Sequence, residues 1–260
     1  MERNSQVPVG YAPRPQTASE KTLAVLEAAL LNSRFTDIVE AAQLPKSTVH
    51  RILAMLIAAG FITGDADHGF RAGARFTHLA GRTLTELDVV KLAQPIIEDL
   101  VADTQCTVHL AEVGPEAVEF VFGAESLRPY RVRSRVGLSA PLHTTGVGKA
   151  VLAQRDLTQV REYAEHTGLP AHTDATLTAV DDLIEDLGRA SKRGYALGLG
   201  EHEVGTVCVS APIFNHRGET VYGLAISSLI VSHPDDAIER FAQQAVSAAA
   251  EISELLGARR

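Results

Sequence analysis

The chain has 260 residues, a formal net charge of −8 at pH 7 and 45% hydrophobic residues, which is enough for two domains with buried cores. No apolar run approaches the ~20 residues that a helix needs to span a bilayer, and residues 1–16 hold three prolines without an apolar signal segment. We therefore expect a cytoplasmic protein with a disordered tail over residues 1–17. Two distant cysteines and scattered histidines exclude a disulfide framework and a metal site of recognisable spacing.

Charge is unevenly distributed along the chain. Residues 1–85 hold nine Lys and Arg against seven Asp and Glu, a net charge of +2, whereas residues 86–260 hold fifteen against twenty-five, a net charge of −10. The basic excess predicts that the N-terminal part binds DNA and that the acidic remainder repels it. A surplus of two charges is small, so it supports this interpretation without proving it.

Three helices are expected before residue 61. The first covers Ser19 to Leu31, with Ser19 as its N-cap. The second covers residues 35–42, and a three-residue break follows it. Pro45 fits the first position of a third helix, which Gly60 ends and whose apolar stripe consists of Val49, Ile52, Leu53, Leu56 and Ile57. Two short helices joined by a tight turn are typical of a helix-turn-helix.

A β-hairpin is predicted directly after the third helix. Residues 61–63 and 69–71 have the pattern of two short strands, and residues 65–69 that of the turn between them. This hairpin would be a wing, so residues 18–75 are expected to form a winged helix-turn-helix DNA-binding domain. The side chains expected to contact DNA are Lys46, Ser47, Thr48, His50, Arg51 and Arg71. The alternative is an ordinary helical hairpin with a solvated polar face.

The pattern changes after the wing. Residues 76–88 carry a helical apolar stripe and are expected to form a linker helix between two domains. Residues 90–103 predict a further helix, with a kink or a restart near Pro95. Extended segments are then expected over residues 107–113, 117–124 and 131–136. In the last segment apolar side chains alternate with a row of arginines, Arg131, Arg133 and Arg135. We favour a solvated strand face for this row; the alternative is an anion-binding patch.

Helices and strands continue to the C-terminus. Helices are predicted over residues 146–153, 156–166, 179–193 and 235–256. Strands are predicted over residues 195–199, 206–214 and 220–230. Asp235 and Asp236 lie at the start of the last helix, where its dipole favours negative charge. Strands flanked by helices predict an α+β domain with an antiparallel sheet over residues 89–260.

A turn of small residues, Thr144 to Lys149, is the best candidate for ligand binding. Its backbone N–H groups lie at the start of a helix and could donate hydrogen bonds to an anion or a carboxylate. A phosphate-binding loop would need glycine where His143 stands and Ser or Thr where Ala150 stands, so we expect no nucleotide hydrolysis. The alternative is that the glycines only allow tight packing of the helix on the sheet.

Three motifs resemble the IclR family of bacterial transcription regulators. The first is Leu44–Leu53 closing with Ala59–Ile62, the second is Pro141–Ala153, and the third is Arg193–Ala196 followed by Glu201–Phe214. They stand in the right order at family-like spacing, and the resemblance extends over nearly the whole chain. It implies a GAF-like effector-binding domain, a linker helix that helps to pair two subunits, and a homodimer or homotetramer.

The resemblance also implies an effector site between the turn and the central sheet. Carried over residue by residue, this site consists of Val132, Ala140, Thr145, Gly146, Val147, Cys208 and Ser227. Relatives often have acidic residues where this chain has Gly198 and Gly200, so their small-acid ligands cannot be assumed. A bulkier or aromatic effector, such as an organic or aromatic acid or a derivative, is expected.

These features predict a ligand-responsive repressor that binds a palindromic double-stranded DNA operator as a dimer or tetramer. No cofactor, metal or membrane is expected to take part. Cys208 has no base placed beside it by sequence, so a catalytic thiol is not expected and neither is an enzyme. Two alternatives stay open: an enzyme or carrier acting on a small molecule, and a winged-helix module that binds a protein.

Overall fold

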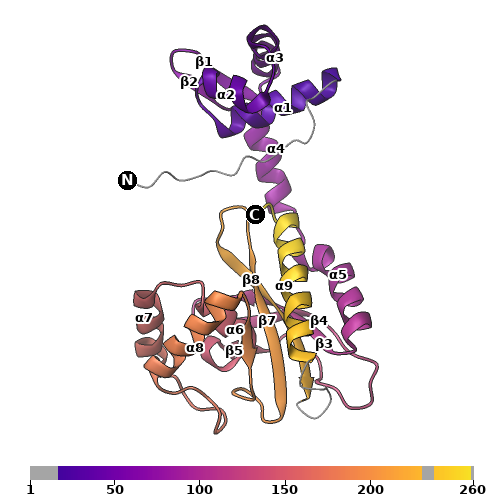
Figure 1. Cartoon of the computed structure of the whole chain (residues 1–260), viewed down its shortest axis with the longest axis vertical. Helices are drawn as coiled ribbons and strands as arrows, with labels where there is room; N and C mark the ends of the chain where they lie inside the picture. The colour runs from indigo at the N-terminus through magenta and orange to yellow at the C-terminus, as the bar shows by residue number, and fades with distance from the viewer. Residues whose placement is uncertain (1–16, 230–236, 259–260) are drawn as a thin grey trace. The chain divides into compact units, whose positions relative to one another are not determined.

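The computed structural model describes residues 17–229 and 237–258, and the chain divides into two compact units, one up to Leu87 and one from Asp88 (Figure 1). The predicted N-terminal tail, the end of the last predicted strand at Ile230, and Asp235 and Asp236 lie outside the described residues. Each unit is considered by itself below. The linker predicted over residues 76–88 falls almost entirely in the first unit.

The first unit has the predicted helix-turn-helix followed by a hairpin and a helix. Its elements are α1 (Ala18–Leu31), α2 (Phe35–Ala42), α3 (Lys46–Ala58), β1 (Ile62–Asp65), β2 (Gly69–Ala72) and α4 (Ala74–Thr85). The N-cap of α1 is Thr17 and not Ser19, because Thr17 and Glu20 form a capping box in which each side chain accepts the other's backbone N–H. Pro45 is the N-cap of α3 and not its first helical residue, so the helix begins at Lys46, one position later than predicted.

The three helices and the hairpin share one hydrophobic core. Val25 of α1, Ile38 of α2 and Val49 of α3 are completely buried, and Phe70 from the hairpin packs against the same cluster. Phe70 also donates its backbone N–H to the Ser33 carbonyl at 2.8 Å, which attaches the wing to the turn between α1 and α2. The core holds α3 by its apolar face and leaves the opposite face of that helix in solvent.

The second unit is built on one antiparallel sheet with strand order β5-β4-β3-β8-β7-β6. Its strands are β3 (Thr107–Val113), β4 (Ala117–Ala124), β5 (Ser139–Pro141), β6 (Ala196–Gly198), β7 (Thr206–Phe214) and β8 (Thr220–Leu229). Its helices are α5 (Val89–Thr104), the short η1 (Leu142–Thr144), α6 (Gly146–Leu152), α7 (Leu157–Thr167), α8 (Val180–Arg193) and α9 (Ala237–Leu255). This is the predicted α+β class.

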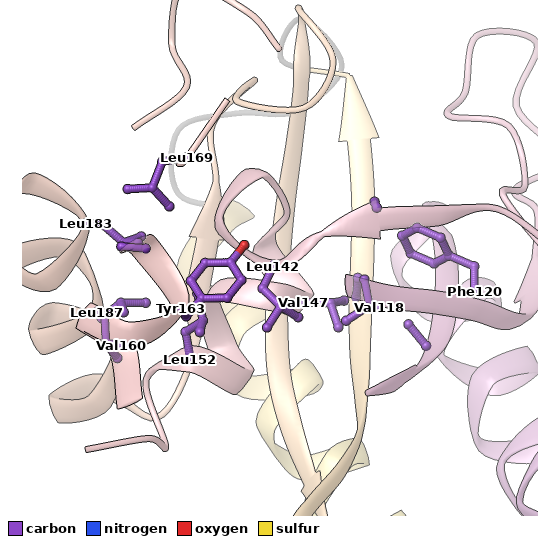
Figure 2. Packing of buried hydrophobic residues seen from close by; sticks show 14 residues of the cluster. Val118, Phe120, Leu142, Val147, Leu152, Val160, Tyr163, Leu169, Leu183 and Leu187 are labelled. Carbon is purple, nitrogen blue, oxygen red and sulfur yellow. The ribbon is translucent and has the colours of Figure 1, made fainter. Parts of the chain in front are cut away.

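Helices cover both faces of this sheet. Figure 1 shows α5 and α9 beside each other on the strands, whereas α6, α7 and α8 gather in another layer. Along β7, Cys208 and Ser210 face α6, and the alternate residue Ala211 faces α9, as the two-residue period of a strand requires. A chain of buried side chains on the α6 side extends from Phe120 on β4 through Val147 to the residues of α7 and α8 (Figure 2).

The prediction of a strand over residues 131–136 is wrong. The segment has no strand pairing, because side chains and not a neighbouring strand take up its backbone groups. Ser134 donates its N–H to a carboxylate oxygen of Glu125 at 2.8 Å, and the Val132 carbonyl accepts the hydroxyl of Thr107 at 2.5 Å. The arginine row is therefore not a strand face.

Of the kink or restart predicted near Pro95, the restart does not occur, because α5 continues through this residue from Val89 to Thr104. Pro95 is the seventh residue of the helix, so its ring removes one backbone hydrogen bond within the helix. Ala93, Ile97 and Leu100 are buried on both sides of the proline. We attribute the continuity of the helix to this burial, which stabilises each such side chain by about 1–3 kcal/mol.

Candidate nucleic-acid interface and ligand pocket

The outward face of α3 is polar and open. Lys46, Ser47, His50 and Arg51 are exposed and Thr48 is half-buried, whereas Val49 and Ile52 on the same helix are buried. All five polar residues lie in the first two turns, next to the N-terminal end of the helix dipole. This end of the helix can therefore approach a phosphate backbone or the edges of bases.

The cations on this surface have no partners within the described part of the chain. Across residues 17–229 and 237–258, no hydrogen bond or ion pair involves the side chain of Lys46, Arg51 or Arg71. Arg75, by contrast, lies 4.9 Å from the centroid of the Phe61 ring and is engaged inside the unit. Cations in such positions, on an exposed helix and an adjacent wing, can neutralise phosphate charge.

The second unit contains a cavity of about 420 Å³ on the α6 face of its sheet, a volume that includes the open mouth. Its wall comes from β3, β4, β7 and β8, from the residues around the start of α6, and from the loop after β6. The residues that line it are His109, Phe120, Arg135, Thr144, Thr145, Gly146, Val147, Gly198, Gly200, Glu201, His202, Thr206, Cys208, Ala225 and Ser227.

The structure brings five of the seven predicted effector residues together on this wall. They are Thr145, Gly146, Val147, Cys208 and Ser227, and the Cys208 thiol donates to the Ser227 hydroxyl at 3.3 Å. Val132 and Ala140 are buried elsewhere. Val132 binds Thr107 through its carbonyl, and Ala140 belongs to the hydrophobic cluster beneath the sheet.

The glycines at the start of α6 serve close packing. A Cβ atom on Gly148 would lie 2.2 Å from the Leu142 carbonyl oxygen, and one on Gly146 would lie 2.7 Å from the Ser210 hydroxyl. The Gly148 N–H is already used, because it donates to the Thr145 hydroxyl at 3.0 Å. Packing therefore explains Gly148, whereas Gly146 both packs on β7 and lines the cavity.

A buried ion cluster lies at the edge of the cavity. The Lys149 ammonium is 2.8 Å from a carboxylate oxygen of Asp186 and donates to Glu201, which accepts the Leu199 N–H through its other oxygen. Burial by itself would raise the pKa of Asp186, but hydrogen bonds from Lys149 and Arg189 outweigh it and hold that pKa below its usual range. The carboxylate of Glu201 thus lines this cavity together with Gly198 and Gly200.

Two histidines on the cavity wall favour the neutral form. Burial, and next the charge of Arg135, lower the pKa of His109 to about 4, and its Nε2 accepts the Arg135 backbone N–H at 3.2 Å. Burial and then Arg135 also lower the pKa of His202. His202 Nδ1 lies 3.0 Å from the Thr144 hydroxyl, and because that hydroxyl donates to the Pro141 carbonyl, we assign the proton to Nδ1.

Sequence patterns did not reveal several of these lining residues. His109 and Phe120 come from strands assigned only as strands, and Arg135 was placed in a strand that does not form. Glu201 and His202 lie in a loop without a periodic pattern. The one available signal was the motif that begins at Glu201, which marked this loop as unusual without saying where it lies.

The chain combines a winged helix-turn-helix, with cations exposed on α3, and an α+β unit with a cavity. This combination is typical of two-domain DNA-binding regulators. Residues 20–66 match the family described as "IclR helix-turn-helix domain", and residues 81–254 match "Bacterial transcriptional regulator IclR C-terminal". The chain therefore belongs to the IclR family of bacterial transcriptional regulators.

Individual relatives agree with this assignment. The chain is 31% identical over 229 residues to the transcriptional repressor IclR of Escherichia coli (strain K12), covering 86% of this chain and 83% of that one. It is 30% identical over 246 residues to the HTH-type transcriptional regulator BhcR of Paracoccus denitrificans (strain Pd 1222), covering 91% and 86%. A solved ICLR transcriptional regulator from Silicibacter sp. TM1040 shares the fold, with a TM-score of 0.84 at 21% identity over 94% of this chain and 97% of that one.

As a member of this family, with a matched helix-turn-helix domain, the chain is a DNA-binding regulator of transcription. Within the described ranges, no helix is both long and apolar enough to cross a membrane.

Proposed function

We propose that this regulator is a repressor that binds a palindromic operator as a dimer and is controlled by a small molecule in the cavity of its second unit. The observation that carries the proposal is the exposed start of α3, where Lys46 and Arg51 have no partner among the described residues. We assign Ser47, Thr48 and His50 to base edges in the major groove. Lys46 and Arg51 would divide between phosphate and guanine contacts, and Arg71 on the wing would contact the backbone.

The dimer proposal depends on α4. No residue of this 12-residue helix is buried, although the helix carries an apolar stripe. Leu79 and Leu84 on that stripe are 46% and 47% exposed. Exposed leucines on a helix without buried residues are expected to pack against a partner helix. Pairing two copies through α4 would present two reading heads, and a twofold-symmetric operator is the matching DNA. A pair of such dimers would give a tetramer.

The effector proposal depends on the cavity. It combines the apolar Phe120 and Val147 with hydroxyl, imidazole and guanidinium groups, the mixture of apolar wall and a few polar groups that small-molecule sites share. A ligand that fits one arrangement of the second unit better than another would shift the population of DNA-binding states. Repression is proposed because the E. coli relative is named a repressor.

Salt dependence tests the DNA-binding surface. We would measure the affinity of the full chain for genomic DNA fragments by fluorescence anisotropy at several salt concentrations. A variant with Lys46→Gln, Arg51→Gln and Arg71→Gln should bind more weakly, and its salt slope should fall by roughly 0.9 for each phosphate that is no longer neutralised. The matched control is Arg217→Gln, which removes an exposed cation that pairs with Glu219 in the second unit. A triple variant that kept the wild-type slope would refute this surface and favour a protein-binding module.

A further inference from the structure

Arg135 is the fixed positive charge on the cavity wall. The pKa of His109 is about 4 and that of His202 is lowered, so among the basic side chains that line the cavity the guanidinium is the one that stays charged at neutral pH. It acts on the cavity interior, because its charge opposes protonation of both histidines and partly offsets the effect of burial on the pKa of the Cys208 thiol. A planar guanidinium in such a place is suited to a carboxylate.

The partner of Arg135 is easy to replace. The Arg135 side chain is 18% exposed and pairs with Glu203, whose side chain is 59% exposed. The nearby cation Lys149 provides an internal contrast, since its partners Glu201 and Asp186 are only 6% and 15% exposed. The Lys149 pairs are buried and fixed, whereas Glu203 can return to water at little cost because an exposed carboxylate regains its hydration.

Glu203 lies on a loop that is attached to the rest of the unit most firmly at its beginning. The Thr176 hydroxyl donates to the Glu201 carbonyl at 2.7 Å, and His202 is bound to Thr144. Further along the loop, the Glu203 carbonyl accepts the hydroxyl of Thr206 at 2.7 Å, whereas the Glu203 side chain is held by its ion pair with Arg135 and Val204 next to it is 80% exposed. Gly205 has a left-handed φ of 79°, which suits a hinge at the end of the loop.

We infer that Arg135 anchors the carboxylate of the effector and that Glu203 is its internal competitor, displaced when the effector binds. The inference rests on the proposed function of the cavity and names its recognition group. In the free protein Glu203 forms an ion pair with the Arg135 guanidinium and keeps the outer half of the loop over the mouth of the site. A ligand carboxylate takes its place, and the Glu203 side chain is released into solvent. Occupancy of the cavity thereby changes the surface of the second unit.

Matched pairs of ligands and variants test the assignment. The probes are lactate with lactamide and benzoate with benzamide, which pair a carboxylate with a neutral analogue of similar shape at two sizes. Binding to the full chain is measured by isothermal titration calorimetry. Glu203→Gln should tighten carboxylate binding about fivefold or more and leave the amides unchanged. Arg135→Gln should weaken carboxylate binding at least about tenfold, and Arg135→Lys should have an affinity between those of the wild type and Arg135→Gln.

The matched control is Arg131→Gln. Arg131 lies on the same segment and pairs with Glu125, but it does not line the cavity, so its loss should leave the dissociation constants unchanged. Hydrogen exchange gives a second measurement: the Thr206 N–H donates to the Glu203 carbonyl at 3.3 Å, and a bound carboxylate should reduce the protection of this amide as Glu203 becomes more mobile.

Two results would overturn the inference. One is equal binding of carboxylates to wild type and Arg135→Gln, and the other is the absence of any carboxylate binding to Glu203→Gln. If neutral ligands bind the cavity and release DNA, the role of Arg135 is refuted and the proposed function is supported. Carboxylates that bind as expected without any effect on DNA would instead uphold Arg135 as an anchor and refute the effector role.

Discussion

Replacing Lys149 by methionine removes the ammonium group that compensates two buried carboxylates. The Lys149 side chain is 2% exposed, and its partners Glu201 and Asp186 are 6% and 15% exposed. Breaking a buried ion pair by removing one partner costs about 3–5 kcal/mol, because the remaining charge is left without compensation. For a unit of this size, that loss lowers the unfolding temperature by roughly 10 °C or more.

The pH dependence of this loss follows from Asp186. Its pKa is held below the usual range in the wild type, so its contribution to stability is present above the unfolded pKa and disappears as the pH falls through the lower folded pKa. The variant lacks the Lys149 part of that contribution. The difference between the two proteins should therefore be largest near neutral pH and shrink below about pH 4.

Urea unfolding followed by circular dichroism measures the difference. A triple variant with Lys149→Met, Glu201→Gln and Asp186→Asn should recover much of the loss, because it removes the charges together. The reasoning would be refuted by a loss below about 1 kcal/mol for the single variant, which is the range of an exposed pair. It would be equally refuted by a triple variant less stable than the single one.

Three further predictions concern other parts of the chain. Arg51→Ala should weaken binding to a DNA site selected by the wild type by about 1–3 kcal/mol in a gel-shift assay, and unchanged affinity with the fold intact would remove Arg51 from the contact set. Leu79→Glu combined with Leu84→Glu should convert the dimer to a monomer in analytical ultracentrifugation, since both leucines are exposed on α4; a persistent dimer would place the interface elsewhere. His109 has a folded pKa of about 4 against 6.5 unfolded, so the unfolded chain binds a proton first as the pH falls and stability is lost across that window, by up to about 3 kcal/mol. His109→Gln should flatten this part of the stability profile in urea unfolding, and an equally steep profile would show that another group is responsible.

The reading head was predictable because its signals are local. The apolar stripe that includes Val49 and Leu53 repeats at helical spacing, and Gly60 interrupts it at the point where a left-handed residue is needed. The buried stripe and the polar face opposite it both follow from this single periodicity. Knowing the buried side of α3 is therefore enough to know which of its side chains stay exposed.

The cavity was only partly predictable, because its residues meet through tertiary contacts. Arg135 alternates with apolar residues as in a strand, but its N–H donates to His109 from another element and the strand does not form. His202 and Glu203 belong to a loop whose path depends on Thr144, Thr176 and the arginine itself. The turn at Gly146 was found because its small residues stand next to one another in sequence, whereas the rest of the wall is scattered along the second unit.

The central claim is that this chain reads a specific DNA site through α3 and the wing. The most direct measurement is a selection of genomic fragments by the purified full chain at physiological salt, followed by sequencing and run in parallel with the Lys46, Arg51 and Arg71 triple variant. We predict that the wild type enriches fragments sharing one twofold-symmetric site and that the triple variant enriches none. Enrichment of no fragment by the wild type, or of the same fragments by both proteins, would contradict the claim.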